Sequence, residues 1–565
     1  NIMAITFTNK AAGEMRDRVD NLIGFGSESV WVSTFHSSCV RILRRFIDHL
    51  GYNTNFSIYD TDDQKTLMRQ ILKKLELDPK AFRDRAMLTA VSGAKNELMS
   101  PEEFRLNAQG DWRAKKIAEV YQCYQEELKK NNALDFDDLI FKTVDLFRTN
   151  ADVLEYYQER FKYIMVDEYQ DTNTAQFRLI ELLAGKYKNL CVVGDDDQSI
   201  YHFRGAKPEI MLNFTKDYPK AETVLLNINY RCTKNVLQAA MNVVDCNKKR
   251  FQKQLSTPNE QGKPVRMMEF DNPREEYMRV SAFLKKRLDA GEDLEDTAVL
   301  FRTNQEAEGL VGALMEYQIP FTMKEQLPNL FRHWISRNLI AYLEMAAGDR
   351  NRKTFLEIMN RPNRYIARDA LTSATVSFDA LQELYKDKDW MCDRITTLET
   401  HLRILSTLAP YAAVNFIRKG MGYEQYLMEY AQYRKIRPEE LLEVLDRIQE
   451  STKGMKTLEE WQAYIEDYTK KLAEQAKKQE KKREGIVVST LHAVKGLEYD
   501  KVYIMNVNEG SIPYKKAVLE EALEEERRLF YVGMTRAKKE LTLCYVRRQY
   551  EKERDPSRFL EETGL

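Results

Sequence analysis

The sequence has 565 residues, 43% of them hydrophobic and 31% charged, which is typical of globular proteins. Lysine plus arginine (87) nearly balances aspartate plus glutamate (88), so the net charge neither indicates nor excludes a nucleic-acid partner. No apolar run approaches the ~20 residues that cross a bilayer, and the seven cysteines form no C-x-x-C pair. These features argue against a membrane protein and a zinc-binding fold, and they favour a cytoplasmic protein of several domains.

Short apolar runs rich in β-branched residues predict strands along the chain. They occur at residues 2–7, 163–166, 190–193, 224–228, 298–301, 486–490, 502–507 and 541–546. Helical patterns lie between most of these runs, which predicts an α/β fold of parallel sheets with helices on both faces. The first run follows directly after Asn1, without a starting methionine, so we expect that an N-terminal part of the natural protein is absent from this sequence.

The predicted strands fall into two groups, and each group is interrupted by a long stretch of helical patterns alone. We therefore predict two α/β cores, each with a helical insertion. The predicted limits are 1–54 and 133–231 for the first core, 55–132 for its insertion, 232–330 and 485–565 for the second core, and 331–484 for its insertion. Residues 456–483 predict a long charged helix, whose basic end fits a solvated helix face better than a nucleic-acid contact.

Two adjacent carboxylates, Asp167 and Glu168, follow the predicted strand at residues 163–166. Open α/β sheets bind their ligands beyond the carboxyl ends of the strands. In that position Asp167 can hold Mg²⁺, and Glu168 can activate water for hydrolysis. The alternative is an acidic helix N-terminus, with Asp171 and Thr172 as caps.

The next predicted strand is followed by a second polar stretch, Gly194-Asp-Asp-Asp-Gln-Ser-Ile-Tyr-His-Phe-Arg-Gly205. The neutral amide of Gln198 can sense a γ-phosphate without adding charge. Tyr201, Phe203 and Arg204 form an aromatic and basic cluster that is suited to stacking on unpaired bases. Packing of the two aromatic rings in a core is the alternative.

These two stretches belong to a longer series of segments. The others are Ile5-Thr-Phe-Thr-Asn-Lys-Ala-Ala12, Ser33-Thr-Phe-His-Ser-Ser-Cys-Val-Arg-Ile-Leu43, Leu134-Asp-Phe-Asp-Asp-Leu-Ile140, Asn229-Tyr-Arg231, Thr490-Leu-His-Ala-Val-Lys-Gly-Leu-Glu498 and Glu525-Glu-Arg-Arg-Leu-Phe-Tyr-Val-Gly-Met-Thr-Arg-Ala537. In this order they resemble the motifs of the UvrD/Rep/PcrA group of superfamily 1 DNA helicases, and the resemblance covers most of the chain. It implies two RecA-like cores.

The resemblance also implies that the cofactors are ATP and Mg²⁺. It assigns hydrolysis to Asp167, Glu168, Gln198, Arg231 and Arg536, metal binding to Asp167 and Glu168, and nucleotide binding to Gln198, Tyr230, Arg231, Gly496, Glu498 and Arg536. Arginine presents planar, permanently charged donors to a phosphoryl group in transfer, so one arginine from each core can clamp the γ-phosphate. Surface ion pairing of the arginines and core packing of Tyr230 are the alternatives.

For DNA, the resemblance implies a set of aromatic, basic and small polar residues. These are Phe7, Asn9, Thr34, His36, Tyr201, Phe203, Arg204, Arg302, Asn304, His492 and Lys495. Aromatic faces stack on bases without reading sequence, while polar and basic groups hold phosphates, so binding to single strands independent of sequence is expected. For His36 and His492 the alternative is a hydrogen-bonded structural histidine.

The chain departs from the family pattern in one important respect. Residues 1–565 contain no glycine-rich phosphate loop of the form G-x-x-x-x-G-K-[ST]. This loop supplies the backbone cradle and the lysine for the β- and γ-phosphates. We therefore expect negligible ATP hydrolysis by the polypeptide as given. Phe203 replaces the usual Trp and Cys232 the usual Ser, and stacking should survive both changes.

The resemblance predicts an ATP-dependent DNA helicase and single-stranded DNA translocase of repair or replication, with 3′ to 5′ polarity. Its expected partners are single-stranded DNA and junctions of single- and double-stranded DNA, without a membrane, and it is expected to act as a monomer or transient dimer. Two alternatives remain open. One is the helicase subunit of a RecB/AddA-type helicase-nuclease, and the other is a DNA-binding remnant that does not hydrolyse ATP.

Overall fold

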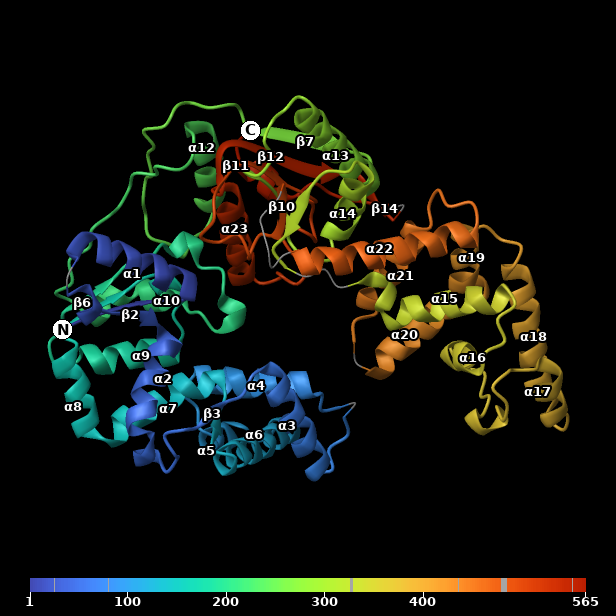
Figure 1. Ribbon diagram of the computed structural model, residues 1–565, viewed down its shortest axis with the longest axis horizontal. Coiled ribbons are helices and arrows are strands. Elements are labelled where there is room, and N and C mark those ends of the chain that lie inside the picture. The colour runs from blue at the N-terminus through green and yellow to red at the C-terminus, as the bar shows by residue number, and fades with distance from the viewer. Residues whose placement is uncertain (25, 80, 326–328, 435, 479–484, 551) are drawn as a thin grey trace. The chain divides into compact units, whose positions relative to one another are not determined.

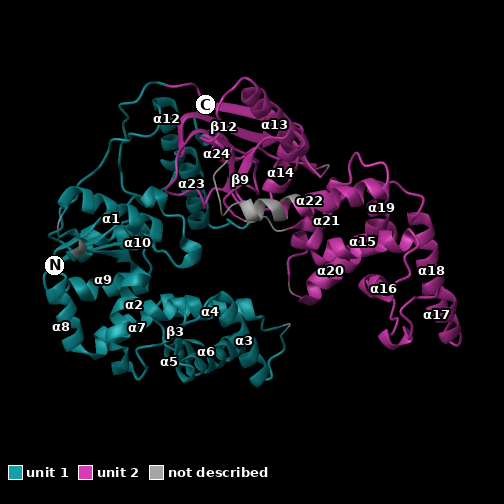
Figure 2. Cartoon of the chain, viewed as in Figure 1, with its two compact units in different colours: residues 1–261, 516–535, 562–565 teal, residues 262–515, 536–561 magenta. Residues whose placement is uncertain are grey.

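The computed structural model describes residues 1–565 except residues 25, 80, 326–328, 435, 479–484 and 551. The chain divides into two compact units, coloured in Figure 2. Unit 1 comprises residues 1–261, 516–535 and 562–565, and unit 2 comprises residues 262–515 and 536–561. Within the described residues, no helix is both long enough and apolar enough to cross a membrane.

Unit 1 contains a four-stranded parallel sheet with the strand order β2-β1-β5-β6. Strands β2 and β6 of this sheet are labelled in Figure 1. Its strands are β1 Ile2–Thr6, β2 Trp31–Thr34, β5 Tyr163–Val166 and β6 Leu190–Val192. The helices of this core are α1 Asn9–Ile23, α2 Phe35–Phe46, α7 Phe136–Thr149, α8 Ala151–Arg160, α9 Thr174–Ala184, α10 Pro208–Leu212, α11 Phe214–Asp217, α12 Lys234–Val244 and α23 Glu520–Met534. In the register of β1 and β5, Ile5 lies beside Val166, so the segments that follow both strands leave at the same edge of the sheet.

One face of this sheet is uncovered next to β6. Met165 and Cys191 lie side by side on neighbouring strands, and both side chains are exposed, as are Tyr163 and Val193. Strands of parallel sheets are normally buried on both faces, so this exposed apolar face is unusual.

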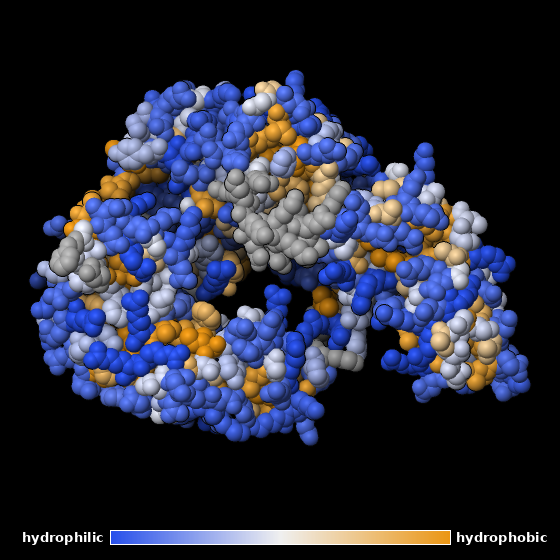
Figure 3. All heavy atoms as spheres, in the orientation of Figure 1, coloured by the Kyte–Doolittle hydropathy of each residue, from blue (hydrophilic) through white to orange (hydrophobic). Residues whose placement is uncertain are grey.

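Residues 224–228 do not form the predicted strand. The segment is extended, and its contact with other backbone in the described chain is a bridge from Ile228 to Ser256. Val224 and Leu226 are about four-fifths exposed, at 80% and 79%. Figure 3 shows hydrophobic atoms at the surface along this stretch, between α1 and α12. The prediction of a strand is wrong here because the apolar run has no neighbouring strand to pair with.

The first helical insertion packs around its own core of buried residues, which include Met68, Val91 and Tyr124. Its helices are α3 Thr61–Lys74, α4 Asp84–Asn96, α5 Pro101–Asn107 and α6 Trp112–Lys130. It is not purely helical, because a two-residue strand near its start, β3 Ser57–Ile58, pairs in parallel with β4 Ala133–Leu134. This pairing joins the two chain ends of the insertion. Strands of two residues are too short to appear as apolar runs in the sequence.

Unit 2 contains a six-stranded parallel sheet with the order β7-β12-β11-β8-β10-β9. Its strands are β7 Arg266–Phe270, β8 Thr297–Phe301, β9 Phe321–Met323, β10 Ile486–Thr490, β11 Tyr499–Ile504 and β12 Ala537–Val546, and a short hairpin follows with β13 Arg548–Gln549 and β14 Lys552–Glu553. The helices of this core are α13 Pro273–Asp289, α14 Ala307–Glu316 and most of α24 Arg558–Glu562. Strands β8 and β10 are buried at every residue, as expected in the centre of a parallel sheet.

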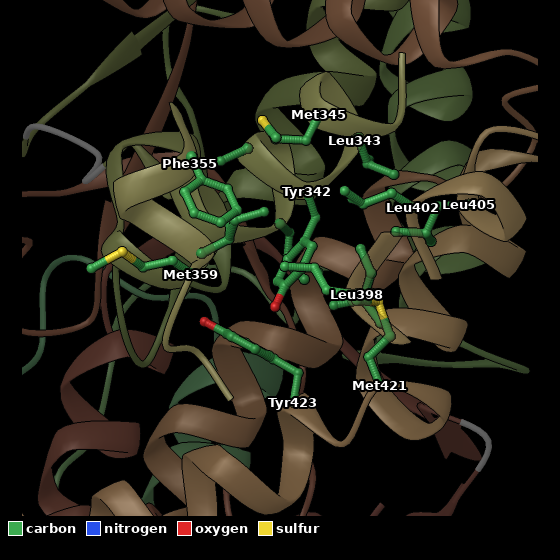
Figure 4. Packing of buried hydrophobic residues seen from close by; sticks show 14 of the residues in the cluster. Tyr342, Leu343, Met345, Phe355, Met359, Leu398, Leu402, Leu405, Met421 and Tyr423 are labelled. Atoms are coloured by element: carbon green, nitrogen blue, oxygen red, sulfur yellow. The ribbon is translucent and has the colours of Figure 1, made fainter. Parts of the chain in front are cut away.

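The second insertion is a helical domain with a large apolar core (Figure 4). Its helices are α15 Trp334–Ala346, α16 Arg352–Ile358, α17 Phe378–Leu384, α18 Asp389–Leu405, α19 Pro410–Asn415, α20 Tyr423–Arg434, α21 Pro438–Ser451 and α22 Leu458–Lys478. Two buried tyrosines in this core satisfy their hydroxyls, since Tyr342 donates to the carbonyl of Arg361 (2.7 Å) and Tyr423 donates to Asn338 (2.9 Å). The predicted charged helix at 456–483 corresponds to α22, and its predicted end at residues 479–483 lies outside the described residues.

The α/β class with two parallel sheets and helical insertions is confirmed. The division into units differs from the predicted limit at residue 231. Unit 1 extends to Gln261 and also includes residues 516–535, because α23 packs against α12 and the turn Asp196–Gln198. The predicted limits of the four domains stay a prediction.

Candidate functional site

Asp167 and Glu168 lie where β5 ends, at the carboxyl edge of the sheet in unit 1. The backbone N–H of Asp167 still donates to the carbonyl of Ile5 on β1 (2.9 Å), so its position is fixed by the sheet. Glu168 adopts a left-handed backbone conformation (φ 53°), which is uncommon for a residue with a side chain and costs free energy. Such strain is typical of functional sites, and a short helix begins only at Tyr169.

Gln170 connects the segments that follow β5 and β6. Its amide nitrogen donates to Glu168 (2.6 Å), and its amide oxygen accepts from the backbone N–H of Asp195 (3.1 Å). A Cβ at Gly194 would come within 2.4 Å of the same oxygen, so a side chain there would displace the Gln170 amide from this contact. The carbonyl of Gln170 also accepts from the Ser199 hydroxyl (3.1 Å). These contacts hold the carboxylates and the polar stretch after β6 in one arrangement.

Gln198 lies in this arrangement and donates its amide N–H to Asp195 (2.7 Å). Within the described residues, Asp195, Asp196 and Asp197 are the one group of three possible metal ligands, with oxygens within 4.8 Å of one another. The ammonium of Lys253, however, contacts all three, at 2.5, 2.5 and 2.9 Å. Arg250 also pairs with Asp197, at 2.6 Å. The three carboxylates are therefore already paired with two cations, which makes the cluster a structural ion network.

The electrostatics of the network depend on burial and on Lys253. Burial raises the pKa of Asp195, but the charge and hydrogen bond of Lys253 outweigh burial and hold that pKa below its ordinary value. For Asp196 burial dominates, so its pKa is raised in spite of Lys253. Asp167 and Glu168 lie outside the network and are partly exposed. Mg²⁺ usually takes one or two protein carboxylates together with phosphate oxygens and waters, so Asp167 and Glu168 fit an Mg²⁺–nucleotide complex better than the network does.

The aromatic and basic cluster after β6 is at the surface. Phe203 is 64% exposed, and its ring lies 5.9 Å from that of Tyr201 in an edge-to-face arrangement. The Arg204 guanidinium lies over both rings, at 5.1 Å from Tyr201 and 5.5 Å from Phe203. Core packing is therefore excluded for Phe203, and Tyr201 is half-buried. Exposed rings of this kind can stack on unpaired bases.

The remaining candidates of unit 1 lie after β1 and β2. Phe7 packs edge-on against the buried Phe35, at 5.3 Å, and Asn9 is exposed. Thr34 is buried and caps α2 by accepting from the N–H of Ser37 (3.2 Å), so its local role is structural. Burial lowers the pKa of His36, which favours the neutral ring.

Phe136 is an exposed aromatic residue beside His36 that the sequence analysis did not single out. The two rings lie 5.5 Å apart, and Phe136 is 53% exposed at the first position of α7. The available signal was that Phe136 stands between two acids, Asp135 and Asp137. A buried ring is not expected directly after Asp135, which forms a capping box with Asp138.

Tyr230 and Arg231 lie at the end of the extended segment in unit 1. Asn229 accepts from the backbone N–H groups of Arg231 and Cys232, both at 2.9 Å, and fixes this turn. Tyr230 is 75% exposed, so core packing is excluded and the ring is accessible to a planar ligand.

In unit 2, four of the candidate DNA contacts follow adjacent strands. Arg302 and Asn304 come directly after β8, and His492 and Lys495 come after its neighbour β10. All four are partly exposed. The sheet therefore brings these four residues to one edge.

The nucleotide candidates of unit 2 differ in exposure. Gly496 has a positive φ of 78° and Glu498 is exposed. Arg536 is 2% exposed, and its guanidinium donates to the carbonyl of Leu497 (3.2 Å). Surface ion pairing of Arg536 is therefore excluded.

Comparisons with known proteins agree with this architecture. The family model described as UvrD/REP helicase N-terminal domain matches residues 1–219, and the model described as UvrD-like helicase C-terminal domain matches residues 224–548. A protein named ATP-dependent DNA helicase PcrA from Bacillus subtilis (strain 168) is 38% identical over 573 residues, which cover 96% of this chain and 76% of that protein. Proteins of the same name from Staphylococcus epidermidis (strain RP62A) and Staphylococcus aureus (strain MRSA252) are each 38% identical, over all of this chain and 80% of their own lengths.

The chain has two parallel sheets, and acidic, amide and basic groups lie beyond the carboxyl ends of their strands. These features define an α/β protein with two cores, of the class that binds ligands at the strand ends. Within that class, the two family models together match nearly the whole chain. The chain belongs to the UvrD/REP helicase family.

Proposed function

We propose that the protein is an ATP-dependent DNA helicase and single-stranded DNA translocase. The observation that carries this proposal is the set of hydrogen bonds in unit 1 that joins Glu168, Gln170 and Gln198. The exposed cluster around Phe203 begins three residues after Gln198. Hydrolytic groups and a base-stacking surface share one set of loops, so a change at one can reach the other. Three relatives named ATP-dependent DNA helicase support the same activity.

In the proposed reaction, Asp167 would hold Mg²⁺, and Glu168 orients and deprotonates the attacking water. When bound, the metal neutralises phosphate charge. The amide of Gln198 contacts the γ-phosphate, and Arg231 stabilises the charge that develops on that phosphate during hydrolysis. Arg536, Gly496 and Glu498 are proposed nucleotide contacts of unit 2, and Tyr230 is proposed to stack on the base.

The proposed DNA contacts combine stacking surfaces with small polar and basic groups. In unit 1 they are Phe7, Asn9, Thr34, His36, Phe136, Tyr201, Phe203 and Arg204. In unit 2 they are Arg302, Asn304, His492 and Lys495. None of these types requires a particular base, so the proposed ligand is single-stranded DNA of any sequence, including the single-stranded side of a junction. The 3′ to 5′ direction and a monomeric or transiently dimeric state are proposed from family membership.

We also propose that the polypeptide of residues 1–565 hydrolyses ATP very slowly by itself, because its sequence contains no G-x-x-x-x-G-K-[ST] segment. Such a segment supplies the backbone cradle and the lysine for the β- and γ-phosphates.

The test of DNA binding is Phe203→Ala. Base–aromatic stacking contributes roughly 1–3 kcal/mol per base, so the dissociation constant for labelled oligo(dT) should rise about 5- to 150-fold. The change should be the same for oligo(dT) and mixed-sequence strands, because stacking does not read sequence. Fluorescence anisotropy titrations at one fixed salt concentration measure both.

Tyr433→Ala is the matched control, because this ring is 69% exposed on α20 of the second insertion and is not one of the proposed contacts. It should leave the affinity unchanged. Equal affinities of the Phe203→Ala variant and the unmodified protein would refute the proposed stacking site.

A further inference from the structure

Two loops of unit 2 meet at the edge of the sheet where Arg302 lies. One loop follows β8 and contains Arg302, and the other follows β11 and runs from Asn506 to Tyr514. Strands β8 and β11 are hydrogen-bonded neighbours, with Leu300 beside Ile504, so their following loops start side by side.

The carboxylate of Glu306 joins these loops. One oxygen accepts from the backbone N–H of Thr303 (2.9 Å), the residue after Arg302, and the other accepts from the hydroxyl of Ser511 (2.6 Å). Glu306 thus uses both carboxyl oxygens to hold two loops that are about 205 residues apart in sequence. Burial raises the pKa of Glu306.

Tyr514 ends the second loop beneath Arg302. The guanidinium carbon of Arg302 lies 5.0 Å from the centre of the Tyr514 ring. A cation–π contact of this kind holds the guanidinium beside the ring. Tyr514 therefore restricts where the N–H donors of Arg302 can lie.

A second set of contacts anchors the same two loops from α13. Asn506 has a left-handed backbone (φ 53°), its N–H donates to Glu276 (3.0 Å), and its amide donates to the Tyr277 hydroxyl (3.2 Å). That hydroxyl donates in turn to the carbonyl of Glu306 (3.2 Å). The start of the second loop and the Glu306 backbone are thereby fixed to one helix.

We propose that Glu306 and Tyr514 are positioning residues for DNA binding, which together hold the guanidinium of Arg302 toward a phosphate of the single strand. The proposal rests on the proposed function, in which Arg302 contacts DNA. Glu306 joins the two loops through both of its carboxyl oxygens, and Tyr514 holds the guanidinium in place beside its ring. Neither residue needs to touch DNA.

The test measures the affinity of the full chain for labelled oligo(dT) across a range of salt concentrations. Arg302→Ala should raise the dissociation constant on the order of tenfold, because a charged hydrogen bond is lost. It should also reduce the slope of log affinity against log salt by about 0.7, the value for one phosphate contact on a single strand. Glu306→Ala and Tyr514→Leu should each reproduce much of both changes.

Conservative variants separate positioning from mere folding. Glu306→Gln keeps an acceptor for Thr303 and a polar group for Ser511, and Tyr514→Phe keeps the ring under Arg302, so both should retain near-normal affinity and slope. In the Arg302→Ala background, Glu306→Ala and Tyr514→Leu should cause no further loss. Thermal unfolding identifies any variant that fails to fold. If Glu306→Ala does not fold, Tyr514→Leu, which changes a partly exposed loop residue, still tests the proposal.

Two results would overturn the proposal in different ways. If Arg302→Ala weakens binding but Glu306→Ala and Tyr514→Leu do not, or if their losses add to that of Arg302→Ala, then the positioning role is wrong and the DNA contact stands. If Arg302→Ala leaves affinity and slope unchanged while Phe203→Ala weakens binding, then the contact assigned to Arg302 is wrong and the positioning role falls with it.

Discussion

Glu276 is a fully buried carboxyl group on α13. One of its oxygens accepts from the N–H of Asn506 at 3.0 Å, and within the described part of the chain its other oxygen has no hydrogen-bond partner. Burial raises the pKa of Glu276 to about 8, against the opposing hydrogen bond of Asn506. The protonated form is therefore favoured in the folded protein near neutral pH, whereas the unfolded chain carries the ionised form.

This raised pKa makes stability depend on pH in one direction. The stabilisation is complete below about pH 4.5, the ordinary value, and is lost as pH rises through about 8. The side chain in Glu276→Gln cannot ionise. The free energy of unfolding of this variant, relative to that of the unmodified protein, should therefore increase by up to ~1.4 kcal/mol per pH unit between pH 5 and 8. Urea unfolding at several pH values measures this gain.

The control for this variant is Glu316→Gln, which changes an exposed carboxylate at the end of α14. Its stability should follow that of the unmodified protein across the same pH range. If the stability of Glu276→Gln also runs parallel to that of the unmodified protein, Glu276 is ionised in the fold and the interpretation is wrong.

At the level of elements, the sequence predicts strands best where an apolar run stands alone. Strands β1, β5, β8 and β10 match such runs within one or two residues. Strand β7, Arg266–Phe270, was missed because only Phe270 of its five residues is buried, so no apolar run marks it. Residues 224–228 were wrongly predicted as a strand, since apolar composition does not supply a pairing partner.

The positions of the candidate site residues could likewise be predicted only in part from the sequence. Asp167, Gln198 and the cluster around Phe203 could be predicted because strand ends and motif order are local features of the sequence. The roles of Glu306 and Lys253 could not. Glu306 acts on a loop about 205 residues away, and Lys253 neutralises Asp195, 58 residues away, so only the folded chain brings these charges together.

Lys95 attaches the first insertion to the core of unit 1 through buried charge. It lies on α4, is 1% exposed, and pairs with Asp135 (2.7 Å) and Asp138 (3.0 Å) at the start of α7. Lys95→Met would leave two buried carboxylates without this partner, which should lower the free energy of unfolding of unit 1 by about 3–5 kcal/mol. Chemical denaturation followed by tryptophan fluorescence measures the loss.

Lys65→Met is a suitable control, because the side chain of Lys65 pairs with the largely exposed Asp62 on α3 and such pairs contribute little. Its effect should stay below about 1 kcal/mol. A loss for Lys95→Met no larger than that for Lys65→Met would mean that the buried pair does not stabilise the insertion.

At the level of the whole molecule, the proposed hydrolysis uses residues from both units. Asp167, Glu168, Gln198 and Arg231 belong to unit 1, and Arg536 belongs to unit 2. The chain passes between the units at residues 261–262, 515–516, 535–536 and 561–562. The proposed DNA contacts are divided in the same way, so both proposals are tested on the whole chain, with single substitutions in one unit or the other.

The polypeptide of residues 1–565 should bind single-stranded DNA without turning over ATP, because stacking and phosphate contacts do not need the missing phosphate loop whereas hydrolysis does. Phosphate release with oligo(dT) and Mg²⁺ should therefore be equal for the unmodified chain and for Glu168→Gln, and both should bind oligo(dT) equally well. DNA-stimulated release that Glu168→Gln abolishes would contradict slow turnover and would identify Glu168 as the base. Release that persists in Glu168→Gln would contradict the role of Glu168 itself.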